Sequence, residues 1–368
     1  MTKKLSLVTS ALLITSSAAF ADSNSIKEAF ANGSTSGDLS VYTEKGTTTG
    51  SADSGFTAGS VGVNYETDSF NGFSVSLGFR GNHELGEEKE NDYEGNHENS
   101  SIVHTAAIKY ANDDFSISAG RQEIDLEWLG DYNEGVVVGI TAIPDTTVVL
   151  GYTNRQAAIA EDESKNFARF DHYDGSKTQA YVADVKYEGF ENTLVNPYYY
   201  TADGIANYYG LKVEYNNDMF GITGQFASSS EDNPANKDGE IIGVEARANV
   251  AGFALALGHI ATDSKGGVGS ITALGENISP TEEIDDQVYG TDASSTYGSI
   301  GYTIADIELG ALYVDTEYLD TTKKDANELT LTAGYNITEE LALSLRFTDY
   351  EVDNVDSDKI AASIVYSF

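Results

Sequence analysis

The last ten residues of the chain, Lys359 to Phe368, alternate strictly between apolar and mixed positions. Counting back from the terminal aromatic, every second residue is apolar: Phe368, Tyr366, Ile364, Ala362 and Ile360. A period of two is that of a β-strand with one apolar face. An aromatic at the margin of such a face has a physical role at a membrane interface, where barrel strands carry girdles of aromatic residues. A soluble β-sandwich would seldom end in this way.

The first 21 residues are typical of a secretory signal peptide. Lys3 and Lys4 precede an apolar run, and Ala19-Phe20-Ala21 forms a small-x-small cleavage site. No later stretch approaches the roughly 20 apolar residues of a spanning helix, so the exported product is either soluble or a barrel. We therefore predict a signal peptide over 1–21, a short N-terminal segment with a helix-like piece over 22–36, and a transmembrane β-barrel over 37–368.

Charge and cysteine content narrow the classes of partner. The formal net charge is −38, and loss of Lys3 and Lys4 with the leader would make it more negative still. Such acidity argues against nucleic acid and anionic lipid as partners, and it suits the attraction of cations. Because the chain has no cysteine, hydrogen-bonded sheet and burial have to stabilise it without disulfides.

One type of connection recurs along the chain: a strand ends in tyrosine, a short Asn/Asp/Gly turn follows, and a new strand opens on an apolar residue. Tyr65 before Asn71-Gly72-Phe73, and Tyr215 before Asn216-Asn217-Asp218-Met219-Phe220, are examples. Longer polar connections lie between these turns, at roughly 46–55, 85–99, 156–176, 228–238, 263–292 and 318–326. Alternation of short with long connections is the mark of a barrel with tight periplasmic turns and long extracellular loops.

We accordingly predict an all-β fold, a transmembrane antiparallel barrel of about 18 strands. Sixteen strands are left open, since the segment 193–202 contains Pro197 and the segment 37–45 is weakly patterned. The predicted strands are 37–45, 56–67, 72–84, 100–111, 114–125, 134–143, 146–156, 177–188, 193–202, 206–216, 219–228, 239–250, 252–262, 293–303, 305–317, 327–336, 340–350 and 357–368.

The phase of several strands separates a lipid face from a lumenal face. Phe73, Val75, Leu77 and Phe79 alternate with a set that contains Arg80. A charge on the lipid face near the midplane costs roughly 2–4 kcal/mol for Arg or Lys, so charged residues should face the lumen. The predicted pore-lining residues are Arg80, Lys109, Arg121, Arg155, Asp184, Lys186, Lys212, Glu214, Glu245, Arg247, Asp306, Glu308 and Arg346, with Lys359 sharing the parity. A lumen with this many charges is expected to hold water rather than a packed apolar core.

Two readings of the lumenal arginines stay open. Arg80, Arg155, Arg247 and Arg346 either guide solutes, as charged rings do in channels, or pair with wall carboxylates and only satisfy the lumen. Arg121 breaks the outward phase of Phe115, Ile117 and Ala119, which suggests a bulge that turns it inward.

Particular motifs resemble known outer-membrane proteins. The final strand, with Ile360, Ala362, Ile364, Tyr366 and Phe368, resembles their C-terminal sorting strand. The stretches Ala29–Gly33, Ser36–Tyr42, Val63–Thr67 with Phe70–Phe73, Ala119–Gln122 and Asn133–Val137 are similar to OprD-like (Opr) porins. The resemblance implies an 18-stranded porin for small solutes, with a third outer loop folded inward and a ladder of lumenal arginines. Here that third connection, Leu126–Asn133, is short, so either it dips in slightly or 156–176 or 263–292 narrows the pore.

Other chemistry has little support. Five scattered histidines without cysteine make a zinc site improbable, and no Ser/His set nominates a hydrolase, so an enzyme is not expected. We expect no metal or cofactor, although the acidic runs 84–94 and 349–358 leave Ca²⁺ or Mg²⁺ at the outer loops open. The expected partners are outer-membrane lipid and lipopolysaccharide, the barrel-assembly machinery and small solutes; a homotrimer is left open.

The sequence thus predicts a Gram-negative outer-membrane porin for passive diffusion of ions and small hydrophilic solutes, with a preference for cations. The alternative is a non-conducting structural or adhesive barrel whose loops fill the lumen, because the connection 263–292 is long enough to do so.

Overall fold

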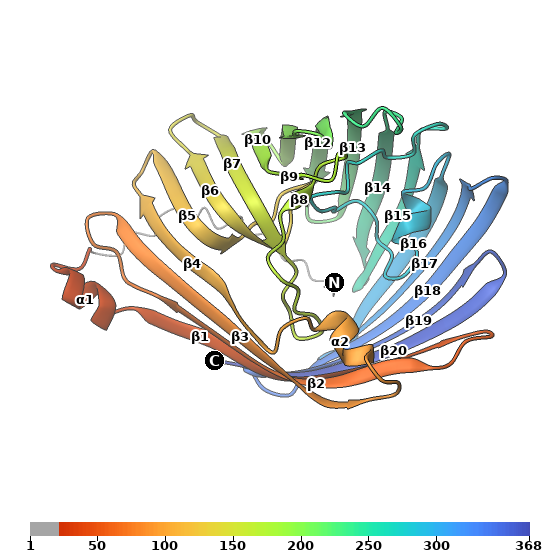
Figure 1. Ribbon diagram of the computed structural model, residues 1–368, viewed down its shortest axis with the longest axis horizontal. Helices are drawn as coiled ribbons and strands as arrows, with labels where there is room; N and C mark the ends of the chain where they lie inside the picture. Colours follow the sequence, from red (N-terminus) through yellow and green to blue (C-terminus); the bar gives the residue numbers. More distant parts are fainter. Residues whose placement is uncertain (1–21) are drawn as a thin grey trace.

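The computed structural model describes residues 22–368, and the predicted signal peptide lies outside these residues. Eighteen strands form one antiparallel sheet that closes on itself (Figure 1). Within the described part of the chain, no helix is long and apolar enough to cross a membrane. The fold prediction is therefore confirmed, with eighteen strands rather than sixteen.

The barrel strands follow one another around the sheet in chain order. They are β1 (Ser34–Thr48), β2 (Ser54–Glu66), β3 (Phe73–Glu87), β4 (Ser101–Ala111), β5 (Phe115–Glu123), β6 (Tyr132–Ile140), β7 (Thr146–Ala157), β10 (Ala180–Phe190), β11 (Thr193–Ala202), β12 (Ala206–Asn216), β13 (Phe220–Glu231), β14 (Glu240–Val250), β15 (Phe253–Thr262), β16 (Ser294–Ile304), β17 (Ile307–Leu319), β18 (Lys323–Asn336), β19 (Leu341–Val352) and β20 (Val355–Ser367). The shorter elements are α1 (Ile26–Ala31), α2 (Asp92–Asn96), α3 (Asp285–Val288) and the two-residue strands β8 (Phe170–Asp171) and β9 (Lys177–Thr178).

The barrel closes where the first and last strands pair. β1 and β20 run antiparallel from the pair Asp38 and Ser367 to the pair Thr48 and Ser357. Beyond the strand, the backbones of Gly37 and Phe368 exchange two hydrogen bonds, of 2.9 and 3.0 Å. Every edge of the sheet is thereby paired, as a segment surrounded by lipid requires.

The proline that made one strand doubtful is accommodated inside β11. Pro197 lies opposite Leu211 of β12 and has no N–H to offer to β10. The side-chain amide of the adjacent Asn196 instead donates to the Val185 carbonyl of β10, at 2.9 Å. This side-chain hydrogen bond takes the place of the missing ladder bond.

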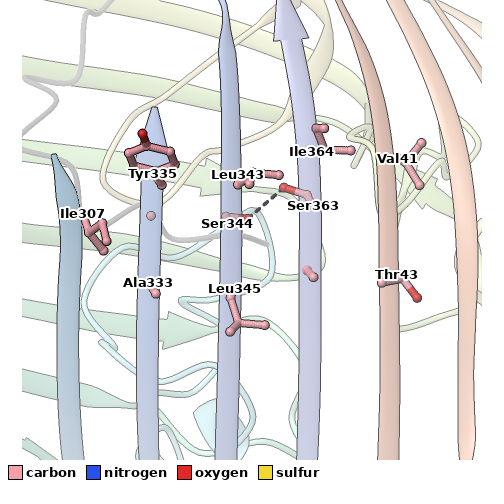
Figure 2. A pocket seen from close by; sticks show the side chains of 12 residues that line it. Val41, Thr43, Ile307, Ala333, Tyr335, Leu343, Ser344, Leu345, Ser363 and Ile364 are labelled. Atoms are coloured by element: carbon pink, nitrogen blue, oxygen red, sulfur yellow. Dashed lines mark hydrogen bonds between the residues drawn. The ribbon is translucent and has the colours of Figure 1, made fainter. Parts of the chain in front are cut away.

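The outer face is apolar and ends in aromatic pairs beside the short turns. Ring centroids of Phe73 and Tyr110 lie 4.8 Å apart, and those of Phe253 and Tyr302 lie 4.5 Å apart. Figure 2 shows part of this face, a shallow apolar depression of about 470 Å³ where Leu343 and other side chains of β17, β18, β19, β20 and β1 lie on neighbouring strands. This band is the surface that meets lipid.

The connections at the two ends of the barrel differ in length, as predicted, but less regularly. The inner connections are all short: 67–72, 112–114, 141–145, 191–192, 217–219, 251–252, 305–306 and 337–340. Among the outer ones, loop 2 (88–100), loop 4 (158–179) and loop 7 (263–293) are long, whereas 203–205, 320–322 and 353–354 are tight. The predicted long connection at 318–326 is wrong, because β17 and β18 continue to Leu319 and from Lys323 as a paired hairpin.

The lumen differs from its sequence-based prediction. A cluster of buried apolar residues fills part of its outer half, where Trp128 of the outer connection 124–131, Ile271 and Leu274 of loop 7 and Tyr200 and Tyr208 of the wall are all at most 1 % exposed. The expectation of a water-filled lumen without a packed apolar core is therefore wrong in this region. The reason is that three outer connections fold inward and bury their own apolar side chains against the wall.

Candidate functional site

The outer connection after β5, here called loop 3 (124–131), enters the lumen although it is short. Trp128 is fully buried in the apolar cluster. The Glu127 carboxylate accepts hydrogen bonds from Lys212 of β12 at 2.9 Å and from Gln225 of β13 at 3.2 Å. Lys212 also pairs with Glu214 at 2.7 Å. The loop thus crosses to the inner surface of strands far from its own and narrows the passage.

Loop 7 spans the lumen between two carboxylates. At one side, Glu231 of β13 accepts hydrogen bonds from the backbone N–H of Ser270 at 2.7 Å and from its hydroxyl at 2.6 Å. At the other side, Glu328 of β18 accepts the backbone N–H groups of Glu282 and Glu283, each at 2.9 Å. Carboxylates that receive backbone N–H groups hold a loop firmly, because charge-assisted hydrogen bonds are stronger than neutral ones.

Loops 3 and 7 also contact each other directly. The Leu274 carbonyl of loop 7 accepts hydrogen bonds from the Gly130 N–H at 3.4 Å and from the Gln156 side chain of β7 at 2.7 Å. Asn277 donates to the Leu126 carbonyl at 3.0 Å. The sequence left open whether the third connection, 156–176 or 263–292 forms the constriction; the structure has the third connection and 263–292 packed together inside the barrel.

Loop 4 bridges from β7 to β3 and to loop 2. Its Ala160 carbonyl accepts the side chain of Asn82 in β3 at 3.5 Å. Its Ser164 exchanges backbone hydrogen bonds with Asn96 and Glu98 of loop 2, at 3.0 and 2.9 Å. In Figure 1 this loop runs across the barrel from β7 toward α2. Since Phe170 of loop 4 also belongs to the buried apolar cluster, loop 4 joins that cluster to loop 2.

Basic side chains on the wall face carboxylates on neighbouring strands or loops. Arg80 of β3 holds Asp38 of β1 through two nitrogens, at 2.6 and 3.0 Å. Other wall pairs are Lys109 with Glu66 at 3.2 Å, Arg247 with Glu245, Arg346 with Glu282 of loop 7 at 2.5 Å, and Lys359 with Glu44 at 3.2 Å and Glu283 at 3.3 Å. These lumenal cations are thus paired with carboxylates, and Glu282 and Glu283 of loop 7 supply some of those partners.

Three predicted pore-lining residues lie on the inner face of the wall, in different settings. Asp184 of β10 is fully buried and accepts hydrogen bonds from Asn196 at 2.8 Å and Tyr200 at 3.2 Å. Glu308 lies close to the inner mouth, on the face opposite its exposed neighbours Ile307 and Leu309. Lys186, two residues after Asp184 along β10, shares its face and is half-buried.

Three others are placed differently from the prediction. Asp306 lies in the inner turn between β16 and β17 with φ 66°, so it does not line the wall. A register shift between the Glu134 and Gly135 pairs interrupts the alternation that predicted an inward Arg155, which is exposed at the outer end of β7. At Arg121 the strand pairing shows no register shift, so the bulge predicted there is absent from both of its ladders.

Arg121 instead occupies the outer rim of the wall. It pairs with Glu134 at 3.1 Å, donates to the Val103 carbonyl at 2.9 Å and lies 4.3 Å from the ring centre of Phe167 in loop 4. Arg121 thereby links the end of β5 to loop 4, and it is set apart from the Arg80 and Arg346 pairs.

The final strand presents its apolar set outward. Ile360, Ile364, Tyr366 and Phe368 are between 39 % and 50 % exposed on the lipid face, and Ala362 lies between them in the depression of Figure 2. The Phe368 ring lies 6.4 Å from that of Tyr366.

Sequence reasoning missed the residues that fix the loops. Glu127, Trp128, Glu231, Glu282 and Glu328 were absent from the predicted set. A signal was present for one of them, since the only tryptophan of the chain stands in a short connection between Leu126 and Leu129. For the carboxylates there was none, because acidic residues are abundant throughout the chain.

The acidic runs 84–94 and 349–358 do not form a cluster that could bind a metal ion. Within residues 22–368, no three His, Cys, Asp or Glu side chains converge in a way that could hold a metal ion. Asp92, from the first acidic run, accepts the backbone N–H groups of Gly55 at 2.9 Å and Lys89 at 3.0 Å. That carboxylate therefore fixes loop 2 to β2.

Several solved structures of outer-membrane channels are similar to this barrel. Pseudomonas aeruginosa OccK3 (OpdO) is 13% identical, with a TM-score of 0.79, over 93% of this chain and 97% of that one. Acinetobacter baumannii OccAB1 is 14% identical with a TM-score of 0.76, over 93% and 98%, and a variant of P. aeruginosa OccD1 (OprD) is 11% identical with a TM-score of 0.69, over 91% and 95%. At these identities the likeness shows the fold, and it confirms the predicted resemblance to OprD-like porins at that level.

Sequence comparison supplies the family. No curated protein matches the chain significantly. Residues 30–228, more than half of the chain, match the family described as "Putative outer membrane protein". The chain belongs to this outer-membrane protein family and has the 18-stranded barrel fold of the OprD-type porins.

Proposed function

We propose that this protein is a passive channel of the outer membrane, which conducts ions and small hydrophilic solutes and prefers cations. The observation that carries the proposal is the charged lining, in which cations on the strands form ion pairs with carboxylates of loop 7 inside the lumen, as at Arg346 with Glu282 and Lys359 with Glu283. Buried charges of this kind need water or partners, and a wide barrel supplies both.

The preference for cations is supported by the excess of carboxylates. Lys212 and Lys359 each face two carboxylates. The chain as a whole has 59 acidic against 21 basic residues. A lumen whose cations are neutralised in this way keeps a negative potential, which concentrates cations and repels anions.

Single-channel recording in planar bilayers tests the proposal. We expect discrete ohmic steps, and in a KCl gradient a reversal potential of the sign for K⁺ preference. Reproducible absence of steps would remove the channel, and a reversal potential of the opposite sign would remove only the cation preference. Heat-denatured protein at the same concentration serves as the control for detergent artefacts.

A second candidate, a barrel closed by its loops, is favoured by the apolar cluster. Ile271, Leu274, Ile284 and Val288 of loop 7 are fully buried against loop 3 and the wall. A variant in which residues 268–288 are replaced by a short Gly/Ser linker distinguishes the two functions. Steps in the variant alone identify a closed barrel, whereas steps in both proteins identify a channel that is open with its loops in place.

A further inference from the structure

The short helix α1 lies outside the barrel, beside the inner ends of β1 and β2 (Figure 1). The Ser25 hydroxyl accepts the Glu28 N–H at 3.2 Å as an N-cap. The helix is docked to the first inner turn, since the Asp68 N–H donates to the Ala29 carbonyl at 3.0 Å and the Ser23 N–H donates to the Ser69 carbonyl at 2.9 Å. Six residues do not form a stable helix alone, so this docking maintains it.

A second contact places α1 on the lipid-facing side of the wall. Tyr65 lies opposite Leu77, which is 53 % exposed on the outer face. Residues directly opposite each other in a sheet share a face, so Tyr65 also points outward. Its hydroxyl donates to the Phe30 carbonyl at 2.5 Å. The end of α1 is therefore attached to an outward-facing tyrosine at the level of the aromatic girdle.

The helix presents an apolar surface that the barrel leaves uncovered. Ile26 and Phe30 are four positions apart, hence on one face, and are 63 % and 54 % exposed. The buried Ala29 adjoins this face, while Lys27 and Glu28 are exposed on the remainder. The uncovered face of Ile26 and Phe30 thus begins next to the docked Ala29 and extends away from the barrel wall.

We infer that α1 is an interfacial helix, which lies in the headgroup region of the periplasmic leaflet with Ile26 and Phe30 against phospholipid acyl chains. The surface is continuous with the girdle that already meets lipid, where Phe73 and Tyr110 pack together. Aromatic and aliphatic side chains on an amphipathic helix bind this region, and a lysine on the polar side reaches the phosphates. The inference concerns the membrane attachment of the chain and is independent of channel activity.

Fluorescence quenching tests the inference, and the emission of the native tryptophan serves as the unquenched baseline. Its only tryptophan, Trp128, is fully buried inside the lumen, so lipid-borne quenchers cannot reach it. Three variants are reconstituted in phosphatidylcholine vesicles with or without dibrominated acyl chains: Phe30→Trp as the probe, Lys27→Trp as the matched polar-face control, and Leu77→Trp as the lipid-facing reference.

We expect brominated lipid to quench the added emission of Phe30→Trp at least twofold more than that of Lys27→Trp. Bromines placed close to the headgroup should quench it more than bromines at the chain ends. Aqueous acrylamide should quench the Lys27→Trp emission more strongly. Acrylamide quenching of Phe30→Trp without quenching by brominated lipid would overturn the inference. If Phe30→Trp fails to fold, Ile26→Trp carries the same test.

Discussion

Inside the barrel, the Glu328 carboxylate of β18 accepts the backbone N–H of Glu283 in loop 7 at 2.9 Å. Glu328 is fully buried, and it also accepts the Glu282 N–H and the Thr330 hydroxyl, each at 2.9 Å. One wall side chain thereby determines where the far side of loop 7 lies. The position of that loop, in turn, sets how much of the lumen is open.

We expect Glu328→Ala to release the far side of loop 7. The substitution leaves two backbone N–H groups without their acceptor, at a cost of about 1–3 kcal/mol each if they stay buried. Limited proteolysis within 263–293 should accelerate, and single-channel conductance should rise. Glu308→Ala, which removes a carboxylate near the inner mouth, is the matched control. Unchanged proteolysis in Glu328→Ala would show that other contacts hold the loop.

The substitution Trp128→Ala should loosen loop 3. Removing a fully buried tryptophan costs about 3–5 kcal/mol through lost contacts and the cavity left behind. We expect residues 124–131 to lose their protection from hydrogen exchange at a lower temperature than in the wild type. Sugars should also enter more rapidly in liposome-swelling assays. Trp128→Phe, which retains a ring, should be intermediate. Swelling rates equal to wild type in Trp128→Ala would exclude loop 3 as a constriction.

Removal of Arg346 should increase the preference for cations. The guanidinium is the positive partner of Glu282, so Arg346→Gln leaves the lumen one charge more negative. We expect the ratio of K⁺ to Cl⁻ permeability, from reversal potentials, to rise by less than tenfold, corresponding to under about 1.4 kcal/mol. Lys323→Gln, at the exposed outer end of β18, should change the ratio less. A fall in the ratio for Arg346→Gln would contradict the proposed selectivity.

Loop 2 should become less firmly docked in acid. His97 stacks on Tyr93 with centroids 4.3 Å apart, and burial lowers the pKa of His97 below its ordinary value of 6.5. Below pH 6.5, the imidazole of an undocked loop binds a proton, whereas the docked imidazole stays neutral. Docking is therefore strongest above pH 6.5 and weakens as the pH falls toward the lowered pKa of the docked His97. Hydrogen exchange of residues 88–100, corrected for intrinsic rates, should show this dependence.

The matched variant for that experiment is His97→Phe. It keeps a ring against Tyr93 and Phe56 but has no proton to bind. Its exchange should be independent of pH between 5 and 8 after correction. A persistent dependence in the variant would assign the effect to another group.

Deletion of Phe368 should weaken closure of the barrel. The residue contributes two backbone hydrogen bonds to Gly37 and an exposed ring on the lipid face. We expect the folded band in unheated gel samples to convert to the unfolded one at a lower temperature. Phe368→Tyr, which retains both the backbone bonds and an aromatic ring, should behave like wild type. Equal conversion temperatures would argue against a role for the residue in closure.

The barrel was predictable because its alternation is local. Residues such as Phe73 and Leu77 differ from Ser74 and Ser76 at every second position, and lipid on one side and water on the other act on each strand separately. Even Pro197, which made one strand doubtful, is compensated by its own neighbour Asn196. The hairpin formed by Tyr318 and Lys324, in contrast, was mistaken for a loop because polar residues pair there outside the membrane.

The constriction was not predictable because its contacts are distant in sequence. Glu127 meets Lys212, and Glu231 meets Ser270, through tertiary folding alone. Alternation also fails wherever a strand is irregular, as beside Arg155, since one inserted residue reverses the side on which all later residues fall.

The hydrogen bond between Thr47 and Asp358 joins residues 311 positions apart. Because β1 can complete its second ladder only with β20, translation and export of almost the entire polypeptide have to precede the sealing of the cylinder. Contacts between such remote partners form slowly, since closing a long loop costs entropy before any bond repays it. Before β1 and β20 pair, the sheet has two edge strands whose backbone N–H and C=O groups lack partners. A chain that lacked either of these strands would therefore be an open, aggregation-prone sheet rather than a smaller pore.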